Sequence, residues 1–187
     1  RSGCMAKDAD MILSEFILLG IGGKELSEEN AAQTAKALNI IQPDFIRVHA
    51  TGIKLESKLG EFVRDGSFTL QSEEGIVIEQ KLFLQQLHEM DSYYVNEHIV
   101  NLLLEVRGNL RTEKQEMLST IDRFLTLPPD ERLLFTVGRR LNIFFRLDDL
   151  KKPKLHQKAG ESLQQILSKN PHVDFAALCN YVRQSQI

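Results

Sequence analysis

The sequence has little cysteine, no long apolar run and no large excess of charge of either sign. Its two cysteines, Cys4 and Cys179, lie near opposite ends of 187 residues, so their spacing signals neither a disulfide framework nor a cysteine-based metal site. No apolar stretch approaches the roughly 20 residues that span a bilayer, and the charged residues 1–10 do not resemble a signal peptide. A net charge of -3 gives no basic footprint for nucleic acid. We therefore expect no nucleic-acid or membrane partner and a cytoplasmic location.

The chain does have enough apolar residues, 42%, for one domain with a sizeable core, alone or with a small appendage. Its most distinctive stretch is Glu15–Glu25, in which an apolar run is followed by three closely spaced glycines and then by a lysine and a glutamate. Phe16 to Leu19 predict a strand buried on both faces, because parallel strands covered by helices read as unbroken apolar runs. Gly20, Gly22 and Gly23 then permit a tight turn or a close approach to a ligand, at the strand end where α/β folds place ligands.

A strand–helix–strand unit is predicted around this turn. Ser27 is a good N-cap for a helix that Pro43 prevents from continuing far beyond Ile41. Residues 45–50 predict the next strand, with Ile46 and Val48 on the face that meets this helix. The unit is typical of a parallel sheet.

Arg47 and His49 fall on the opposite face of that strand, which makes them the best functional candidates in the sequence. A buried charge is costly unless it is paired or faces a ligand, so one interpretation places both side chains in a barrel lumen or crevice. The other interpretation is an edge strand whose second face is exposed to solvent. The pattern alone does not separate the two.

The remaining sequence is mainly helical. We expect a short strand over 92–95, a helix from Asn96 to Gly108, a linker over 151–160 and two short helices after it. The expected organisation is a partial barrel over 1–90, a helical extension over 91–150, and a linker with short helices over 151–187.

Two more specific motifs, a dinucleotide-binding fingerprint and a set of metal ligands, are not supported by the sequence. The glycine turn resembles the start of a dinucleotide fingerprint, but Glu25 stands where the third glycine belongs. Asp91, Glu97 and His98 could be imagined as metal ligands, but adjacent side chains at a helix start point in different directions, so a solvated cap is the favoured interpretation. We predict no metal ligands in this chain.

The order of features resembles the second half of a radical S-adenosylmethionine (radical SAM) barrel. The residues that carry the resemblance are the runs Phe16–Glu25, Pro43–Val48 and Thr51–Leu55, and then Ser92–Leu103 with Glu105–Gly108. In that family, a strand ending in a glycine-rich turn with a glutamate precedes a helix and a Pro-Asp-x-x-Arg strand. The defining Cys-x-x-x-Cys-x-x-Cys motif is absent, and with two cysteines this chain cannot hold the [4Fe-4S] cluster.

The resemblance implies an α/β fold: a partial (β/α) barrel fragment with few parallel strands, followed by a largely helical C-terminal extension. It implies a C-terminal fragment that is inactive alone, in a full-length protein that uses a [4Fe-4S] cluster to cleave S-adenosylmethionine. Gly20, Gly22, Gly23 and Glu25 would lie near the adenosyl group, with Arg47 and His49 lining the lumen. The implied partners are the N-terminal half-barrel, a small-molecule or protein substrate, and a second copy through an uncovered sheet edge.

A competing interpretation is a non-catalytic binding or assembly module. Such a module would be a short α/β core under a helical layer, complete in itself, with apolar helix faces that dock a partner. It would cover its own strand edges, whereas a half-barrel leaves one edge open.

Overall fold

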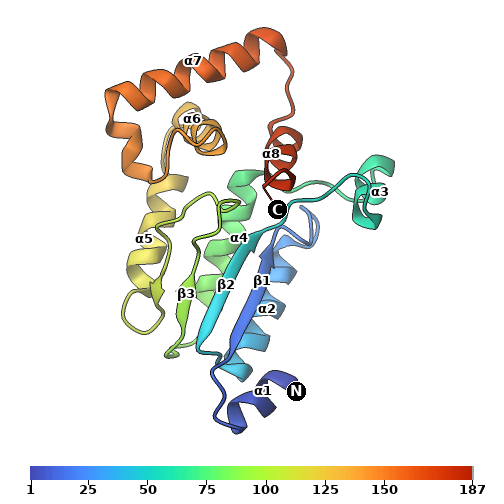
Figure 1. Cartoon of the computed structure of the whole chain (residues 1–187), viewed down its shortest axis with the longest axis vertical. Helices are drawn as coiled ribbons and strands as arrows, with labels where there is room; N and C mark the ends of the chain where they lie inside the picture. The colour runs from blue at the N-terminus through green and yellow to red at the C-terminus, as the bar shows by residue number, and fades with distance from the viewer. Residues whose placement is uncertain (187) are drawn as a thin grey trace.

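The computed structural model describes residues 1–186 and shows an α/β fold built on one four-stranded sheet (Figure 1). The strands are β1 (Ser14–Leu19), β2 (Phe45–Ala50), β3 (Tyr93–Val95) and β4 (Gly108–Asn109), and they neighbour one another in that order. The first three are parallel, and β4 runs antiparallel to β3. The helices are α1 (Ser2–Asp8), α2 (Ser27–Ile41), α3 (Lys58–Asp65), α4 (Glu73–Gln86), α5 (Lys114–Leu125), α6 (Pro129–Arg140), the 3-10 helix η1 (Leu147–Lys151), α7 (Pro153–Lys169) and α8 (Phe175–Gln184).

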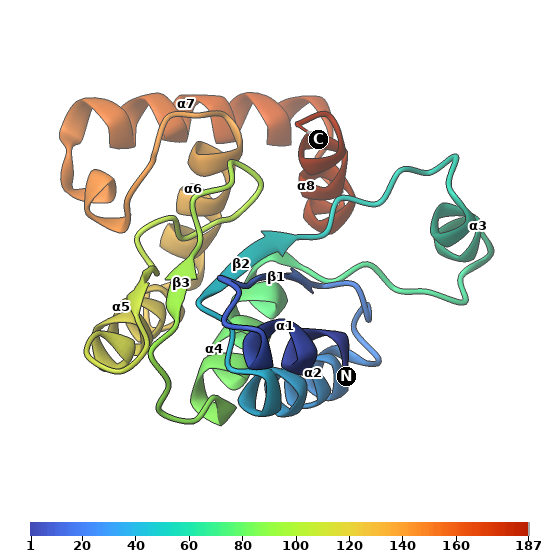
Figure 2. The ribbon, with the colours of Figure 1, turned by 60° about the horizontal axis from the view of Figure 1, so that its bottom comes forward.

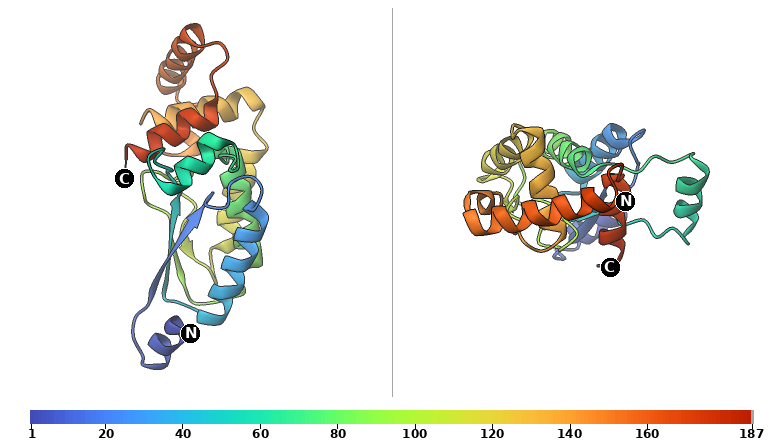
Figure 3. Two further views of the ribbon diagram at one scale, coloured as in Figure 1. Left: turned by 90° about the vertical axis from the view of Figure 1, so that its right-hand side faces the viewer. Right: turned by 90° about the horizontal axis from the view of Figure 1, so that it is seen from above.

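Helices α2 and α4 cover one face of the parallel strands (Figure 3). Ile46 and Val48 of β2 point into this layer and are buried, as the period-two pattern predicts. The α/β class and the strand–helix–strand unit are therefore confirmed. The prediction that β1 is buried on both faces is wrong: Phe16 is 63% exposed and Leu18 is 46% exposed, because no helix among residues 1–186 covers the second face of the sheet there.

The helix starts agree with the sequence only in part. Ser72 caps α4, as serine at a helix start commonly does, since its Oγ accepts a hydrogen bond from the Gly75 N–H at 3.0 Å. Ser27 does not cap α2, whose N-cap is Leu26. The Ser27 hydroxyl instead donates to the buried carboxylate of Glu79 on α4, and so ties the two covering helices together.

The helix expected from Asn96 to Gly108 is absent, and residues 96–107 form a loop of turns. Two buried asparagines explain why. The Asn96 amide donates to the Leu103 carbonyl at 2.7 Å, and the Asn101 side chain bonds both the Val48 carbonyl and the Ala50 N–H on β2. Asparagine amides compete with helical backbone hydrogen bonds in this way, and here they fasten the loop to the sheet.

The C-terminal helices return to the sheet. The linker expected over 151–160 is helical instead, because α7 begins at Pro153, a residue suited to a first helical turn, and continues past Gly160. Beyond it, α8 packs at the carboxyl end of β2 (Figure 1), where Asn180 exchanges two hydrogen bonds with the Ile53 backbone. Residues 127 positions apart thus build one corner of the molecule.

Between β2 and α4 the chain makes an excursion that carries α3 away from the other elements (Figure 2). Ser57 caps α3 through the Gly60 N–H, and Gly66 ends it with a left-handed φ of 80°. Over the described residues 1–186, no helix has both the length and the apolar character that crossing a membrane requires.

Candidate functional site

The uncovered face of the parallel strands gathers the side chains that the sequence singled out on β2. Arg47 and His49 project from β2, Phe16 lies beside them on β1, and His98 follows β3 in the loop. The Phe16 and His49 rings meet edge to face with centroids 5.4 Å apart, and the His98 ring lies 4.1 Å from that of His49. These residues, with Val48, Val95 and Glu97, line a hollow of about 410 Å³.

Arg47 supplies a cation to this open-face hollow. The Arg47 guanidinium lies over the Phe45 ring and donates from Nε to the Ser14 hydroxyl at 3.1 Å. Glu97 is the carboxylate of the hollow and is already paired with Arg107. Partial burial lowers the pKa of His49, and the neighbouring His98 and Arg47 lower it further. The hollow can therefore stack a flat ring and attract an anionic group.

The glycine turn has a different environment. Gly20 and Gly23 have left-handed φ angles of 78° and 63°, which explains glycine at both positions. The Gly20 N–H donates to Glu79 at 2.9 Å, and a Cβ on Gly23 would lie 2.7 Å from the Thr69 carbonyl oxygen. A Cβ on Gly22 would lie 2.9 Å from the Leu26 carbonyl oxygen. Contacts within the chain thus account for all three glycines.

Glu25 ends this turn on the surface. A hydrogen bond from the Thr69 side chain lowers the pKa of its carboxyl, and backbone hydrogen bonds lower it further. None of Gly20, Gly22, Gly23 and Glu25 lines the open-face hollow. The structure therefore brings Arg47 and His49 together but does not bring the glycine turn to them.

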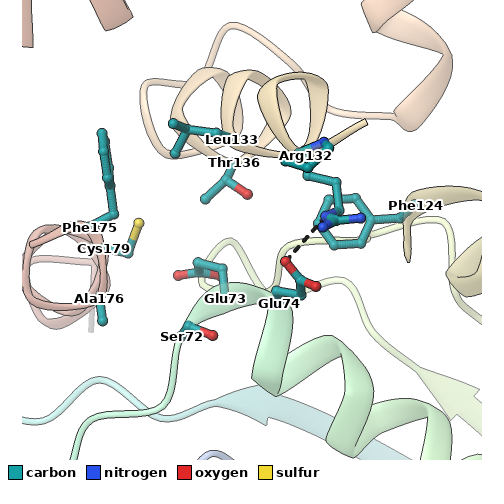
Figure 4. A pocket seen from close by; sticks show the side chains of 11 residues that line it. Ser72, Glu73, Glu74, Phe124, Arg132, Leu133, Thr136, Phe175, Ala176 and Cys179 are labelled. Carbon is teal, nitrogen blue, oxygen red and sulfur yellow. Dashed lines mark ion pairs between the residues drawn. The ribbon is translucent and has the colours of Figure 1, made fainter. Parts of the chain in front are cut away.

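A second cavity of about 180 Å³ lies between α4, α6 and α8 (Figure 4). Glu73 reaches its wall, is 4% exposed, and accepts hydrogen bonds from Arg140 and Arg183. Burial would raise the pKa of this carboxyl, but the two guanidiniums outweigh burial and lower it. Glu73 is therefore an ionised anchor that joins three helices. At the same cavity, Arg132 Nε lies 3.2 Å from a Glu74 oxygen.

The thiols do not form a site. Cys4 lies on α1, whereas Cys179 is buried on α8, where burial raises its pKa to about 12. Throughout the part of the chain that the structure describes, no three His, Cys, Asp or Glu side chains are placed to share a metal ion. The residues present do not fit a [4Fe-4S] cluster, which needs at least three thiolates.

Sequence reasoning missed three residues that shape these sites. His98 was assigned to a solvated helix cap, and its position depends on the asparagine-fastened loop. Phe16 belongs to a strand that the sequence predicts to be buried on both faces, so the exposure of its side chain was not expected. Glu79 is a charged residue inside a helix, and no local pattern distinguishes its buried carboxylate from a solvated one.

Comparisons with known proteins gave no relatives: no family model, no curated protein and no solved structure matches this chain. The fold and the open-face hollow are therefore interpreted from their own geometry.

Proposed function

We propose that this chain is the C-terminal part of a radical SAM iron–sulfur protein and that it is inactive alone. The observation that supports this most directly is the placement of Arg47 and His49 side by side on the uncovered face of three parallel strands. Helices cover the opposite face, as they do outside a (β/α) barrel, whose inner face is its lumen. The open-face hollow is then part of the wall of that lumen.

The cluster and S-adenosylmethionine supply the chemistry in this proposal, namely reductive cleavage to methionine and a 5′-deoxyadenosyl radical. The thiolates come from the N-terminal half of the barrel, since Cys4 and Cys179 cannot provide them. This half contributes binding and orientation: Arg47 offers a cation for an anionic group, and the rings of Phe16, His49 and His98 offer a surface for a flat ring. The cytoplasm remains the expected location.

The test uses the full-length gene product, reconstituted anaerobically with iron and sulfide. We expect about four irons per chain and production of 5′-deoxyadenosine when a reductant and S-adenosylmethionine are added. Substituting Arg47→Ala or His49→Ala should lower this production at least tenfold without loss of the cluster. Arg111→Ala, a change at an exposed residue just after β4 that does not line the hollow, is the matched control and should retain activity. A full-length protein with neither cluster nor cleavage excludes the proposal.

The alternative, a non-catalytic binding or assembly module, has one observation in its favour. The carboxyl end of β1 is closed by the chain itself, because Asn30 donates to the Leu18 carbonyl and Glu79 accepts from the Gly20 N–H. A module complete in itself is expected to close its strand edges in this way. Size-exclusion chromatography separates the two, since a clean, stable monomer of residues 1–187 favours the module.

A further inference from the structure

Two phenylalanines stand on opposite sides of the cavity between α4, α6 and α8 (Figure 4). Phe124 comes from α5 and Phe175 from α8, and Leu133 of α6 lies over the space between them. The cavity holds about 180 Å³, and an apolar cavity of about 150 Å³ is known to accept benzene. Pro129 is exposed and Glu74 is half-exposed, so the cavity opens to solvent where α6 and α4 begin. One six-membered ring therefore fits and can enter.

A buried hydroxyl without a partner faces this cavity. Thr136 of α6 lines it and is 7% exposed. Threonine inside or at the end of a helix commonly donates to a carbonyl one turn earlier, as Thr126 does to the Asp122 carbonyl at 2.8 Å. The Thr136 hydroxyl makes no hydrogen bond within residues 1–186, and its side chain hangs from α6 into the space above Glu73 (Figure 4). Burial of an unbonded hydroxyl costs free energy, which a ligand with a hydrogen-bonding group recovers.

The charged groups on the cavity wall already have counter-ions. Glu73 accepts hydrogen bonds from Arg140 and Arg183, neither of which lines the cavity. Arg132 forms an ion pair with Glu74 at 3.2 Å. An anionic ligand would therefore face the Glu73 carboxylate directly, and a cationic ligand would compete with guanidiniums that are already in place. The wall favours a neutral ligand.

We propose that this cavity binds a neutral hydroxylated aromatic molecule of about the size of phenol. Its ring lies between Phe124 and Phe175, since aromatic rings pair favourably in offset or edge-to-face arrangements. Its hydroxyl group bonds the Thr136 hydroxyl, because each hydroxyl can both donate and accept. The proposal does not depend on the radical SAM assignment, since the cavity shares no residue with the open-face hollow.

The test is a titration of residues 1–187 with phenol and, separately, with toluene, followed by ligand-observed proton NMR. Toluene has the shape of phenol with a methyl group in place of the hydroxyl. Thr136→Val keeps the shape of the side chain and removes its hydroxyl, so it should weaken phenol binding by about threefold to tenfold and leave toluene binding unchanged or stronger. Thr136→Val should also unfold at the wild-type temperature or above it, because the lost hydroxyl had no partner. Thr126→Val, at an exposed threonine outside the cavity, is the matched control and should bind both ligands like the wild type.

A second variant tests the location of the ligand. Ala176 lines the cavity from α8, and Ala176→Leu should fill part of the space and abolish binding of both ligands. Absence of phenol binding to the wild type overturns the proposal, as does equal phenol affinity in the wild type and Thr136→Val. Benzoate that binds as tightly as phenol overturns the assignment of a neutral ligand. If Ala176→Leu does not fold, competition replaces it: toluene that displaces phenol from the wild type supports one shared cavity, and failure to compete overturns it.

Discussion

The centroids of the His49 and His98 imidazole rings lie 4.1 Å apart with their planes inclined by 32°, although the two residues are 49 positions apart in the chain. Two protonated rings at this distance repel each other. Partial burial, His98 and Arg47 all lower the pKa of His49, so the folded protein binds a proton at His49 less readily than the unfolded chain. The contribution of His49 to the free energy of unfolding is then fully present above the unfolded pKa, near 6.5. It is lost as pH falls through the folded pKa.

We therefore expect Tm to fall when pH is lowered from 7.5 to 5. His49→Phe, which keeps a ring beside Phe16 and His98, should show a smaller fall over the same range. Tm measured by circular dichroism at several pH values checks this. His172→Phe is the control, because that ring is on the surface, and it should follow the wild type. An identical pH profile for His49→Phe and the wild type contradicts the role given to His49.

Removing the carboxylate of Glu73 should destabilise the fold strongly. Glu73→Ala leaves the guanidiniums of Arg140 and Arg183 buried without their shared partner, and breaking a buried pair in this way costs about 3 to 5 kcal/mol. Glu74→Ala removes the neighbouring, half-exposed partner of Arg132 and should cost under about 1 kcal/mol. Urea unfolding of both variants measures the difference. Similar losses for the two would show that Glu73 is no anchor.

Alanine at two left-handed glycines should have unequal effects. Gly66 has φ of 80° and open space around it, so Gly66→Ala meets backbone strain alone, about 1 kcal/mol. Gly23 has φ of 63°, and its added Cβ would collide with the Thr69 carbonyl oxygen, so Gly23→Ala should cost more than about 2 kcal/mol. Urea unfolding compares the two directly. Equal costs would mean that the Lys24–Thr69 contact is looser than described, and the glycine turn would then be open to a ligand.

Cysteine reactivity tests the docking of α8 at the end of β2. Cys179 is 2% exposed, and burial raises its pKa to about 12, so a thiol reagent at pH 8 should react with it only after unfolding. Cys4 is half-exposed and should react in the folded protein. In the Cys4→Ser variant Cys179 is the remaining thiol, so its rate of labelling is measured alone. Fast labelling of Cys179 in the folded Cys4→Ser variant would contradict the packing of α8.

The local sequence was sufficient where one pattern decided the structure. The helix that ends at Ile41 and the strand over 45–50 follow from apolar periodicity, Pro43 and short loops. The strand matches the structure residue for residue, whereas the helix begins at Ser27, the residue predicted to cap it. The side of β2 that carries Arg47 and His49 follows from the period of two. The same reasoning failed for β1, because an apolar run is also compatible with a strand whose second face stays open.

Long-range contacts determine the parts of the structure that no local sequence pattern predicts. Asn101 fastens the loop after β3 to β2, which converts an expected helix into turns and brings His98 to His49. Glu73 and Arg183 lie 110 positions apart, and nothing in either segment indicates the other. The candidate site was therefore predictable on β2 and not beyond it.

The free edge of β1 leads to the last prediction. The carbonyls of Leu13, just before β1, and of Leu19 accept from the N–H groups of Phe45 and Thr51. Odd-numbered positions here therefore bond toward β2, and the backbone of Phe16 faces away from the sheet. Asn30 and Glu79 close only the carboxyl end of this edge. Exposed strand edges invite pairing with another chain.

We expect the isolated chain to self-associate through this edge, with a sedimentation coefficient that rises with concentration. Phe16→Lys places a charge on the edge strand and should weaken association at least tenfold, since charged residues on edge strands oppose pairing. Ile40→Lys makes the same change at a side chain on α2 that is 67% exposed, and it should associate like the wild type. A wild type that stays monomeric at all concentrations would show that β1 needs no partner strand, and this would favour the self-contained module over the half-barrel.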